Sequence, residues 1–489
     1  MSFVSITFLI FYLVVLTLRF SVGRDKRSAW YLYGLLVLGL LFYGWHVPAY
    51  LLLLLNCIVS NFVAAMILQS LNANSRYLRN LTLLLVLAIN LGLLAYFKYR
   101  GFLSELYLDL AGSPAREGSI SAVEVLLPVG ISFYTFQALS YTIDVYRGQE
   151  TAQNRPGRFA LYVSFFPQLV AGPIVRASQF FYQWSRTRRV RLRVFSWGTY
   201  LILRGLFFKV VVADNLGQVV DKYWRLASAT DAPETLAFSL LVFYSCQLLC
   251  DFMAYTDIAR GVAYQLGFRL PVNFNAPYIA GSFSDFWHRW HITLSRWMRD
   301  YVYLPLGGNR GGRWRTCRNL VVVMLVSGLW HGAGLNFIAW GAVHAVAIVT
   351  ERATGVTRLL GRAGLQGNWW PASLIATLSW YLVVQLTWIF SMAFFRSVDI
   401  ENAWQILGNA VQGLFLIAEH GVEFDRSKGV ITAAWWFTMP VVALHFRTFV
   451  AERFRIRSSV YERSIYAGAM IYAVISLYAP DQRFIYFQF

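Results

Sequence analysis

Long windows that carry almost no charge constrain this chain more than any other feature of its sequence. A helix needs about 20 apolar residues to cross a bilayer, and each window approaches this length when its flanking residues are included. The windows are Ser5–Leu18, Tyr31–Trp45, Ala49–Leu68, Leu81–Tyr96, Phe238–Leu249, Leu320–Leu329 with Phe337–Val349, Leu374–Ala393 and Ile431–Leu444. Because 57% of the 489 residues are hydrophobic and only 14% are charged, a soluble globule, a disordered chain and a collagen-like fibre are excluded. We predict an all-α polytopic membrane protein with roughly 10–12 embedded helices.

The surplus of basic residues lies mainly between these windows. The chain has 43 Lys and Arg against 24 Asp and Glu, which gives a net charge of +19. Clusters at residues 24–27 and 186–193 are typical of cytosolic loops under the positive-inside rule, which we favour over nucleic-acid binding. The first apolar window has no basic region before it, which predicts an uncleaved helix with its N-terminus outside. Part of the surplus is also available for an anionic cytosolic ligand.

The windows change character along the chain. Residues 1–100 look like four ordinary spans with short loops, and residues 351–489 again alternate polar loops with spans. Between them, residues 125–350 are repeatedly interrupted by Pro, Gly, Asp, His and Arg, for instance at Leu127–Gly130 and Phe165–Pro173. Non-helical backbone at membrane depth persists only where protein or a water-filled cavity shields it from lipid. We therefore predict one membrane domain, residues 1–489, whose middle part forms re-entrant segments that line a cavity.

One histidine lies deep in this interrupted region. His331, in the segment Trp330-His331-Gly332, falls between the apolar stretches Leu320–Leu329 and Leu335–Ala345. An ionisable group at membrane depth is costly, so it is a functional-site hypothesis by default. Burial favours the neutral ring that a general base requires. A neutral histidine that is only hydrogen-bonded between helices fits the sequence equally well.

A second candidate segment, residues 282–301, is rich in Trp, Arg and His. Its apolar side chains recur at helical spacing and its Arg residues largely occupy the remaining face. This pattern predicts an amphipathic helix at the membrane interface, with Ser282 as its N-cap. His288 and His291 are three residues apart and could share a face of that helix. Further ligands are not apparent beside them, and the four cysteines lack metal-site spacing, so we predict no metal.

Two further groups of charged residues have both a functional and a structural interpretation. Asp251 and Asp257 are six residues apart in an apolar stretch, so they face different ways on a helix. This spacing favours acids that are each hydrogen-bonded or ion-paired over a paired-carboxylate mechanism. The Gly- and Arg-rich segment 306–318 lacks the Walker Lys-Ser/Thr ending. Its amides and guanidinium groups could hold phosphates, and a plain positive-inside loop explains it equally well.

The order of these motifs along the chain resembles that of a known family. Leu-Pro-Val-Gly-Ile-Ser-Phe-Tyr-Thr-Phe at 127–136 is followed by Tyr-Thr-Ile-Asp-Val-Tyr-Arg at 141–147, Phe-Pro-Gln-Leu-Val-Ala-Gly-Pro-Ile at 166–174, Asp251–Asp257, Phe286–Tyr303 and Trp330-His331-Gly332. The series resembles the membrane-bound O-acyltransferases, and is most similar to their bacterial alginate O-acetyltransferase type.

The resemblance implies roles for individual residues. It makes His331 the catalytic histidine of the family and His291 its second catalytic histidine, which could orient the His331 ring, bind the donor or stabilise the oxyanion. Relatives commonly have Trp-Arg-Arg-Trp-His where this chain has residues 287–291, so His288 replaces an arginine and is not interpreted as catalytic. We expect supporting roles for Asp251, Tyr255, Asp257, Trp290, Trp330 and Asn336. We further hypothesise that the phosphates of coenzyme A are bound by Arg310, Arg313, Arg315 and Arg318.

The resemblance also implies a reaction and a location. Cytosolic acetyl-CoA is expected to donate acetyl, with His331 as general base near the constriction of a central funnel through the bacterial inner membrane. The acceptor is expected to be an exported polysaccharide, such as alginate, or a periplasmic partner with a serine-hydrolase-like (SGNH) fold. Two alternatives remain open: a D-alanyl-type acyltransferase that uses a carrier-protein thioester, and a transporter or channel in which His331 relays protons.

Overall fold

Every regular element that the structure describes is a helix, which confirms the predicted all-α class. The structure is a computed structural model, and it describes residues 2–22, 28–72, 74–111, 127–185, 190–229, 234–357, 359–360, 371–420, 429–456, 458–479 and 484–485. The basic cluster at 24–27 and the arginines at 186, 188 and 189 lie outside the described residues. Contacts within the chain define two compact units. The first unit is Met1–Leu203 with Tyr255–Pro271, and the second is Arg204–Ala254 with Val272–Phe489.

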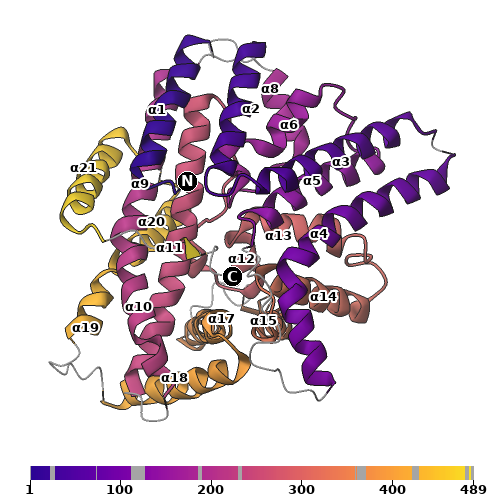
Figure 1. The fold of residues 1–489 in the computed structure, drawn as a ribbon. Coiled ribbons are helices and arrows are strands. Elements are labelled where there is room, and N and C mark those ends of the chain that lie inside the picture. The colour runs from indigo at the N-terminus through magenta and orange to yellow at the C-terminus, as the bar shows by residue number, and fades with distance from the viewer. Residues whose placement is uncertain are drawn as a thin grey trace. The chain divides into compact units, whose positions relative to one another are not determined.

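The helices follow the chain from indigo to yellow in Figure 1. The first unit contains α1 (Ile6–Ser21), α2 (Ala29–Gly44), α3 (Tyr50–Ser70), α4 (Arg76–Leu110), α5 (Ile131–Tyr146), α6 (Pro156–Ser164), α7 (Phe166–Leu169) and α8 (Ala177–Ser185). Two helices contribute residues to both units, α9 (Leu192–Phe207) and α11 (Glu234–Leu266). The second unit contains the π-helices η1 (Phe208–Ala213) and η3 (Arg299–Tyr303), the 3₁₀ turn η2 (Pro277–Ile279), α10 (Asp214–Ala227), α12 (Phe283–Arg289), α13 (Ile292–Met298), α14 (Arg313–His331), α15 (Leu335–Thr354), α17 (Pro371–Arg396), α18 (Ile400–His420), α19 (Gly429–Trp436), α20 (Met439–Phe454) and α21 (Val460–Ser476).

Six stretches of helix in the described residues are long and apolar enough to cross a membrane, and the chain is a multi-pass membrane protein. They are Tyr50–Ser70, Arg76–Leu108, Leu192–Ala227, Leu236–Leu266, Leu374–Arg396 and Gly429–Phe454. The shorter apolar helices α1 and α2 coincide with the first two predicted windows. In the most apolar window of α11, 89% of the residues are buried inside the protein, whereas in that of α4 only 17% are buried. The total of 10–12 embedded helices stays a prediction.

Polar side chains join three helices of the first unit. The side-chain amide of Asn61 on α3 donates to Asn90 Oδ1 on α4 at 3.1 Å, and the hydroxyl of Thr142 on α5 donates to Asn61 Oδ1 at 2.7 Å. Asn61 is 0% exposed and Asn90 is 3% exposed. Hydrogen bonds of this kind hold helices together in membranes, where burial of apolar surface supplies little driving force.

The interrupted segments of the first unit are shielded by protein, as their sequence requires. Residues 159–175, which include α7, are almost entirely buried. The Tyr162 carbonyl accepts hydrogen bonds from the side-chain amides of Gln137 and Gln168 at 2.7 and 2.8 Å, and the Tyr162 hydroxyl donates to the Val175 carbonyl at 2.9 Å. The backbone groups that the breaks release are therefore paired with side chains of the same unit.

An ionic cluster fixes the π-helix η1 in the second unit. The Lys209 ammonium lies 2.8 Å from Asp214 Oδ1 and 3.1 Å from Asp251 Oδ1, and all three residues are buried. Asp251 Oδ2 also accepts the backbone N–H of Ile485 at 2.7 Å, so the described part of the C-terminal segment is tied to α11. One buried ammonium group therefore pairs with two buried carboxylates from different helices.

We predict that Lys209→Met destabilises the protein strongly, because it leaves two buried carboxylates without this cation. Removal of one partner of a buried ion pair costs about 3–5 kcal/mol of unfolding free energy. The measurement is the thermal midpoint of the purified protein in detergent. Lys222→Met is the matched control, since Lys222 on α10 is exposed. Equal midpoints for the two variants would contradict a stabilising role for the cluster.

Candidate functional site

Close packing of α14 on α15 brings His331 to a buried position at the end of α14. A Cβ atom at Gly341 would lie 2.6 Å from the Met324 carbonyl oxygen, and one at Gly328 would meet the Phe337 carbonyl, so only glycine allows this approach. Gly332 ends α14 in an extended conformation, with the Phe337 ring where a side chain would be. The glycines around His331 thus serve the backbone packing of this helix pair.

His331 is 4% exposed and lies among aromatic rings of the second unit. The centroid of its imidazole is 5.0 Å from those of Trp330 and Trp340, and 5.2 Å from that of Phe395 on α17. All three ring pairs are close to perpendicular. The ring is therefore held in one orientation by packing, which a positioned general base requires.

Residues 282–301 do not form the single helix that the spacing of their apolar side chains predicts. The structure has α12 up to Arg289, extended backbone at Trp290, and His291 at φ 38° and ψ 54° before α13 starts at Ile292. Positive φ is unusual for a residue other than glycine. Asn273 stabilises the break, since its carbonyl accepts the N–H of Ile292 at 2.9 Å and its Oδ1 accepts the Thr293 hydroxyl at 2.7 Å.

This break corrects two further expectations. His288 and His291 do not share a helix face, because His288 is exposed on α12 and its Nδ1 lies 2.6 Å from the Ser284 carbonyl, whereas His291 is 1% exposed. The aromatic stripe is not a membrane-interface anchor, because Trp290 is 1% exposed and packs 4.4 Å from the ring of Trp388. The expected N-cap is confirmed, as Ser282 Oγ accepts the N–H of Asp285 at 2.9 Å.

The break places His291 on the same tryptophan that contacts His331. The His291 ring centroid is 5.6 Å from that of Trp330 and 4.7 Å from that of Phe252 on α11. Burial lowers the pKa of the His291 ring to about 3, so the ring is uncharged at neutral pH. The two histidines predicted as a pair, 40 positions apart in the sequence, therefore both contact the indole of Trp330.

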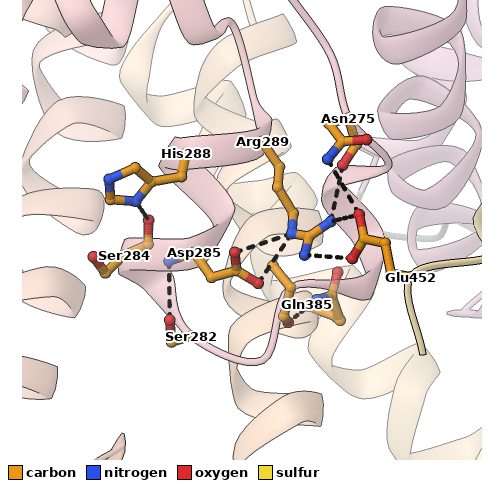
Figure 2. A network of polar contacts seen from close by, with 9 residues as sticks. Asn275, Ser282, Ser284, Asp285, His288, Arg289, Gln385 and Glu452 are labelled. Carbon is orange, nitrogen blue, oxygen red and sulfur yellow. Dashed lines mark hydrogen bonds and ion pairs between the residues drawn. The ribbon is translucent and has the colours of Figure 1, made fainter. Parts of the chain in front are cut away.

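The arginine that follows His288 is fully engaged in a structural network, shown in Figure 2. The Arg289 Nε atom lies 3.0 Å from both carboxylate oxygens of Asp285, and its Nη2 lies 3.0 Å from Glu452 Oε2 on α20. The Nη1 atom donates to Glu452 Oε1 at 3.1 Å and to the Asn275 carbonyl at 3.2 Å. This guanidinium ties α12 to α20, and each of its three nitrogens already forms at least one hydrogen bond.

The four arginines predicted to bind phosphates are all exposed, but they do not all lie in a loop. Helix α14 already begins at Arg313, so only Arg310 belongs to the glycine-rich turn. Arg313 donates to the carbonyl of Ala353, and Arg318 donates to Asn319 Oδ1 at 3.0 Å. In the described part of the chain, Arg310 and Arg315 form no ion pair, so their charges remain available.

The supporting residues occupy distinct environments. Asp251 takes part in the Lys209 cluster, and Asp257 lies 3.1 Å from Arg260, so both acids are ion-paired, as expected from their spacing. Tyr255 stacks on Phe3 in the first unit, with ring centroids 4.5 Å apart. The side-chain amide of Asn336 donates to the carbonyls of Phe394 and Ser397 at 3.2 and 2.8 Å, which binds α15 to the end of α17.

Two buried polar residues near the histidines were not predicted. The Glu351 carboxylate accepts the N–H groups of Phe283 and Ser284 at 2.6 and 3.2 Å, so it caps α12 from α15. His344 Nε2 lies 3.1 Å from Ser391 Oγ, and its ring is 4.7 Å from that of Trp340. His344 also interrupts an apolar window, the signal that singled out His331. In the described residues, no group of His, Cys, Asp or Glu has the arrangement of a metal site.

Known proteins of one enzyme family are similar to this chain. The model of the membrane-bound O-acyltransferase family matches residues 156–399, which include both histidines. The probable alginate O-acetylase of Pseudomonas aeruginosa is 36% identical over 83% of this chain and 74% of that protein. The peptidoglycan O-acetyltransferase of Helicobacter pylori is 34% identical over 77% of this chain and 73% of that protein.

A more distant relative has a different named reaction. The teichoic acid D-alanyltransferase of Bacillus subtilis is 30% identical over 45% of this chain and 57% of that protein. Acyl transfer is common to the printed names of all three relatives. With the all-α membrane fold and the extent of the alginate-type match, this chain belongs to the membrane-bound O-acyltransferase family, and it is an O-acyltransferase.

Proposed function

We propose that this protein transfers acetyl from cytosolic acetyl-CoA to a hydroxyl group on the far side of the bacterial inner membrane. The acceptor belongs to an exported polysaccharide such as alginate, or to a periplasmic partner enzyme that passes the acetyl group on. The observation that supports this proposal is the contact of both His331 and His291 with the buried indole of Trp330. The polysaccharide acetyltransferases among the relatives support acetyl over D-alanyl as the transferred group.

In the proposed step, His331 acts as the general base. The acceptor oxygen attacks the thioester carbonyl carbon while the neutral imidazole takes the hydroxyl proton. The new carbon–oxygen bond replaces the carbon–sulfur bond, and the proton then passes from His331 to the departing thiolate. Proton transfer of this kind contributes typically about 10²–10⁴-fold in rate. Because the ring is only 4% exposed, this step requires a passage that admits both substrates to it, which is the funnel predicted from the sequence.

His291 and Trp330 are assigned to positioning in this mechanism. The uncharged His291 ring packs on the indole that also contacts His331, so it can fix the orientation of Trp330. Such positioning matters because displacement of a reacting group by about 1 Å can cost about 10²-fold in rate. Asn273 and Glu351 extend the support, because Asn273 binds the start of α13 beside His291 and Glu351 caps the start of α12.

The direct test is reconstitution of the purified protein in liposomes with acetyl-CoA labelled on the acetyl group. We expect labelled ester on an added hydroxyl acceptor, with acetylated alginate or peptidoglycan fragments as the first candidates. A carrier protein loaded with D-alanine serves as the competing donor. Transfer only from the carrier thioester would replace the acetyl proposal by the D-alanyl-type reaction. Labelled acetyl that crosses the membrane without ester formation would favour a transporter.

We predict that His331→Ala reduces acetyl transfer by about 10²–10⁴-fold, because it removes the base. The rate of ester formation in liposomes is the measurement, at matched protein content and with an unchanged thermal midpoint. His288→Gln is the matched control, since His288 is exposed and bonded only to its own helix backbone in the described structure. A His331→Ala variant that folds, inserts and transfers acetyl at the normal rate would refute the mechanism.

We predict that Arg310→Gln combined with Arg315→Gln raises the KM for acetyl-CoA without a comparable loss of kcat. Loss of charge-assisted contacts to the phosphates weakens donor binding by about tenfold or more. Adding Arg313→Gln and Arg318→Gln tests whether the arginines on α14 contribute. Initial rates over a range of acetyl-CoA concentrations provide the measurement. If the variant with all four substitutions shows an unchanged dependence of rate on acetyl-CoA concentration, coenzyme A is not bound by this segment.

A further inference from the structure

A cavity of about 660 Å³ lies where two candidate membrane spans end, inside the first unit. The span Leu192–Ala227 begins directly after Arg191, and the span Leu236–Leu266 ends directly before Gly267. Both Arg191 and Gly267 line the cavity. The ends of membrane-spanning helices mark the boundary between the apolar core and the headgroup region. The volume falls within the about 300–1,000 Å³ that is usual for small-molecule sites.

The lining of this cavity combines two positive charges with apolar surface. Arg191 and Arg269 are both exposed, and neither forms an ion pair in the described part of the chain. Val190, Val194, Tyr264 and Phe268 supply the apolar part of the wall, and none of the described residues that line the cavity is a carboxylate. Paired guanidinium groups are suited to phosphate oxygens, and an apolar wall is suited to the lipid-like part of the same ligand.

The cavity is built on rigid supports. The side chain of Gln183 brackets the backbone of Arg269, accepting its N–H at 2.6 Å and donating to its carbonyl at 3.1 Å. Phe268 is 0% exposed and stacks on Phe180, with ring centroids 5.2 Å apart. The backbone that carries Arg269 is therefore held in place without a ligand, which lowers the cost of ordering the loop on binding.

The two span ends are also fixed against each other. Helices α9 and α11 approach closely at Gly198 and Gly261, where a Cβ at Gly198 would lie 2.7 Å from the Gly261 carbonyl oxygen. One turn away, the side-chain amide of Gln265 donates to the Thr199 hydroxyl at 2.9 Å. Arg191 and Arg269 thus lie next to the ends of two candidate membrane spans that are fixed against each other.

We propose that this cavity binds the phosphate-bearing headgroup of an anionic phospholipid from the surrounding membrane. Basic pockets between membrane helices on the cytosolic side recognise such headgroups. The basic run 186–193 predicts that this end of the span faces the cytosol, where coenzyme A carries the same chemical group. A lipid is the favoured source because the cavity lies at the span ends and has a largely apolar wall.

The test compares lipid retention by the full-length protein and its variants in detergent, measured by native mass spectrometry with added phosphatidylglycerol. We expect the wild type to retain the lipid and the Arg191→Gln/Arg269→Gln variant to bind it at least about tenfold more weakly. Arg225→Gln is the matched control, since Arg225 is exposed at the end of α10. The single variants and the thermal midpoints show whether weaker binding reflects misfolding.

A second arm adds coenzyme A, which supplies phosphates without a lipid. We expect it to leave phosphatidylglycerol bound, and to bind the double variant as well as it binds the wild type. Displacement of the lipid by coenzyme A, with weaker coenzyme A binding in the double variant, would overturn the lipid assignment in favour of the acyl donor. Unchanged lipid retention in the double variant would overturn the site itself. Neither measurement requires turnover, so both are independent of the proposed reaction.

Discussion

The structure depends on one constraint: each interruption of a buried helix must find partners for the backbone groups that it releases. In the first unit, Gln137 and Gln168 satisfy the carbonyl of Tyr162 beside the short helix α7. In the second unit, Asn273 pairs with the backbone at the start of α13, and Glu351 pairs with that at the start of α12. Lipid cannot supply such partners, and at these interruptions side chains of the protein do so.

Satisfying the backbone at one such interruption also creates the candidate site. A continuous helix through residues 282–301 would carry His291 on a regular helical face, whereas the break at Trp290 places it against Trp330 at the end of α14. The glycines at 328 and 341 allow α14 and α15 to approach closely enough to bury His331. Backbone packing and the proposed chemistry therefore rest on the same few contacts.

Local features were predictable from sequence, and features set by distant partners were not. The apolar windows predicted the helices because a helix in lipid satisfies its own backbone, and Ser282 was predictable as a cap because its partner is three residues away. The break at His291 was not predictable, since residues 282–301 keep helical spacing throughout and Asn273 comes from a separate loop. The Glu351 cap acts on a helix 68 residues earlier in the chain. The resemblance identified both histidines, but their common contact with Trp330 required the tertiary structure.

The basic residues fall into two groups, those that pair with carboxylates and those that are exposed on the surface. Lys209 and Arg289 each direct their donors at two carboxylates, so they hold helices together and have little capacity left for a ligand. Arg191, Arg269, Arg310 and Arg315 are exposed and form no ion pair among the described residues. The net charge of +19 is therefore an excess of cations that the folded protein does not neutralise internally. Because desolvated ion pairs are costly to form and to break, such unneutralised arginines are the ones that we propose as binding groups for lipid or coenzyme phosphates.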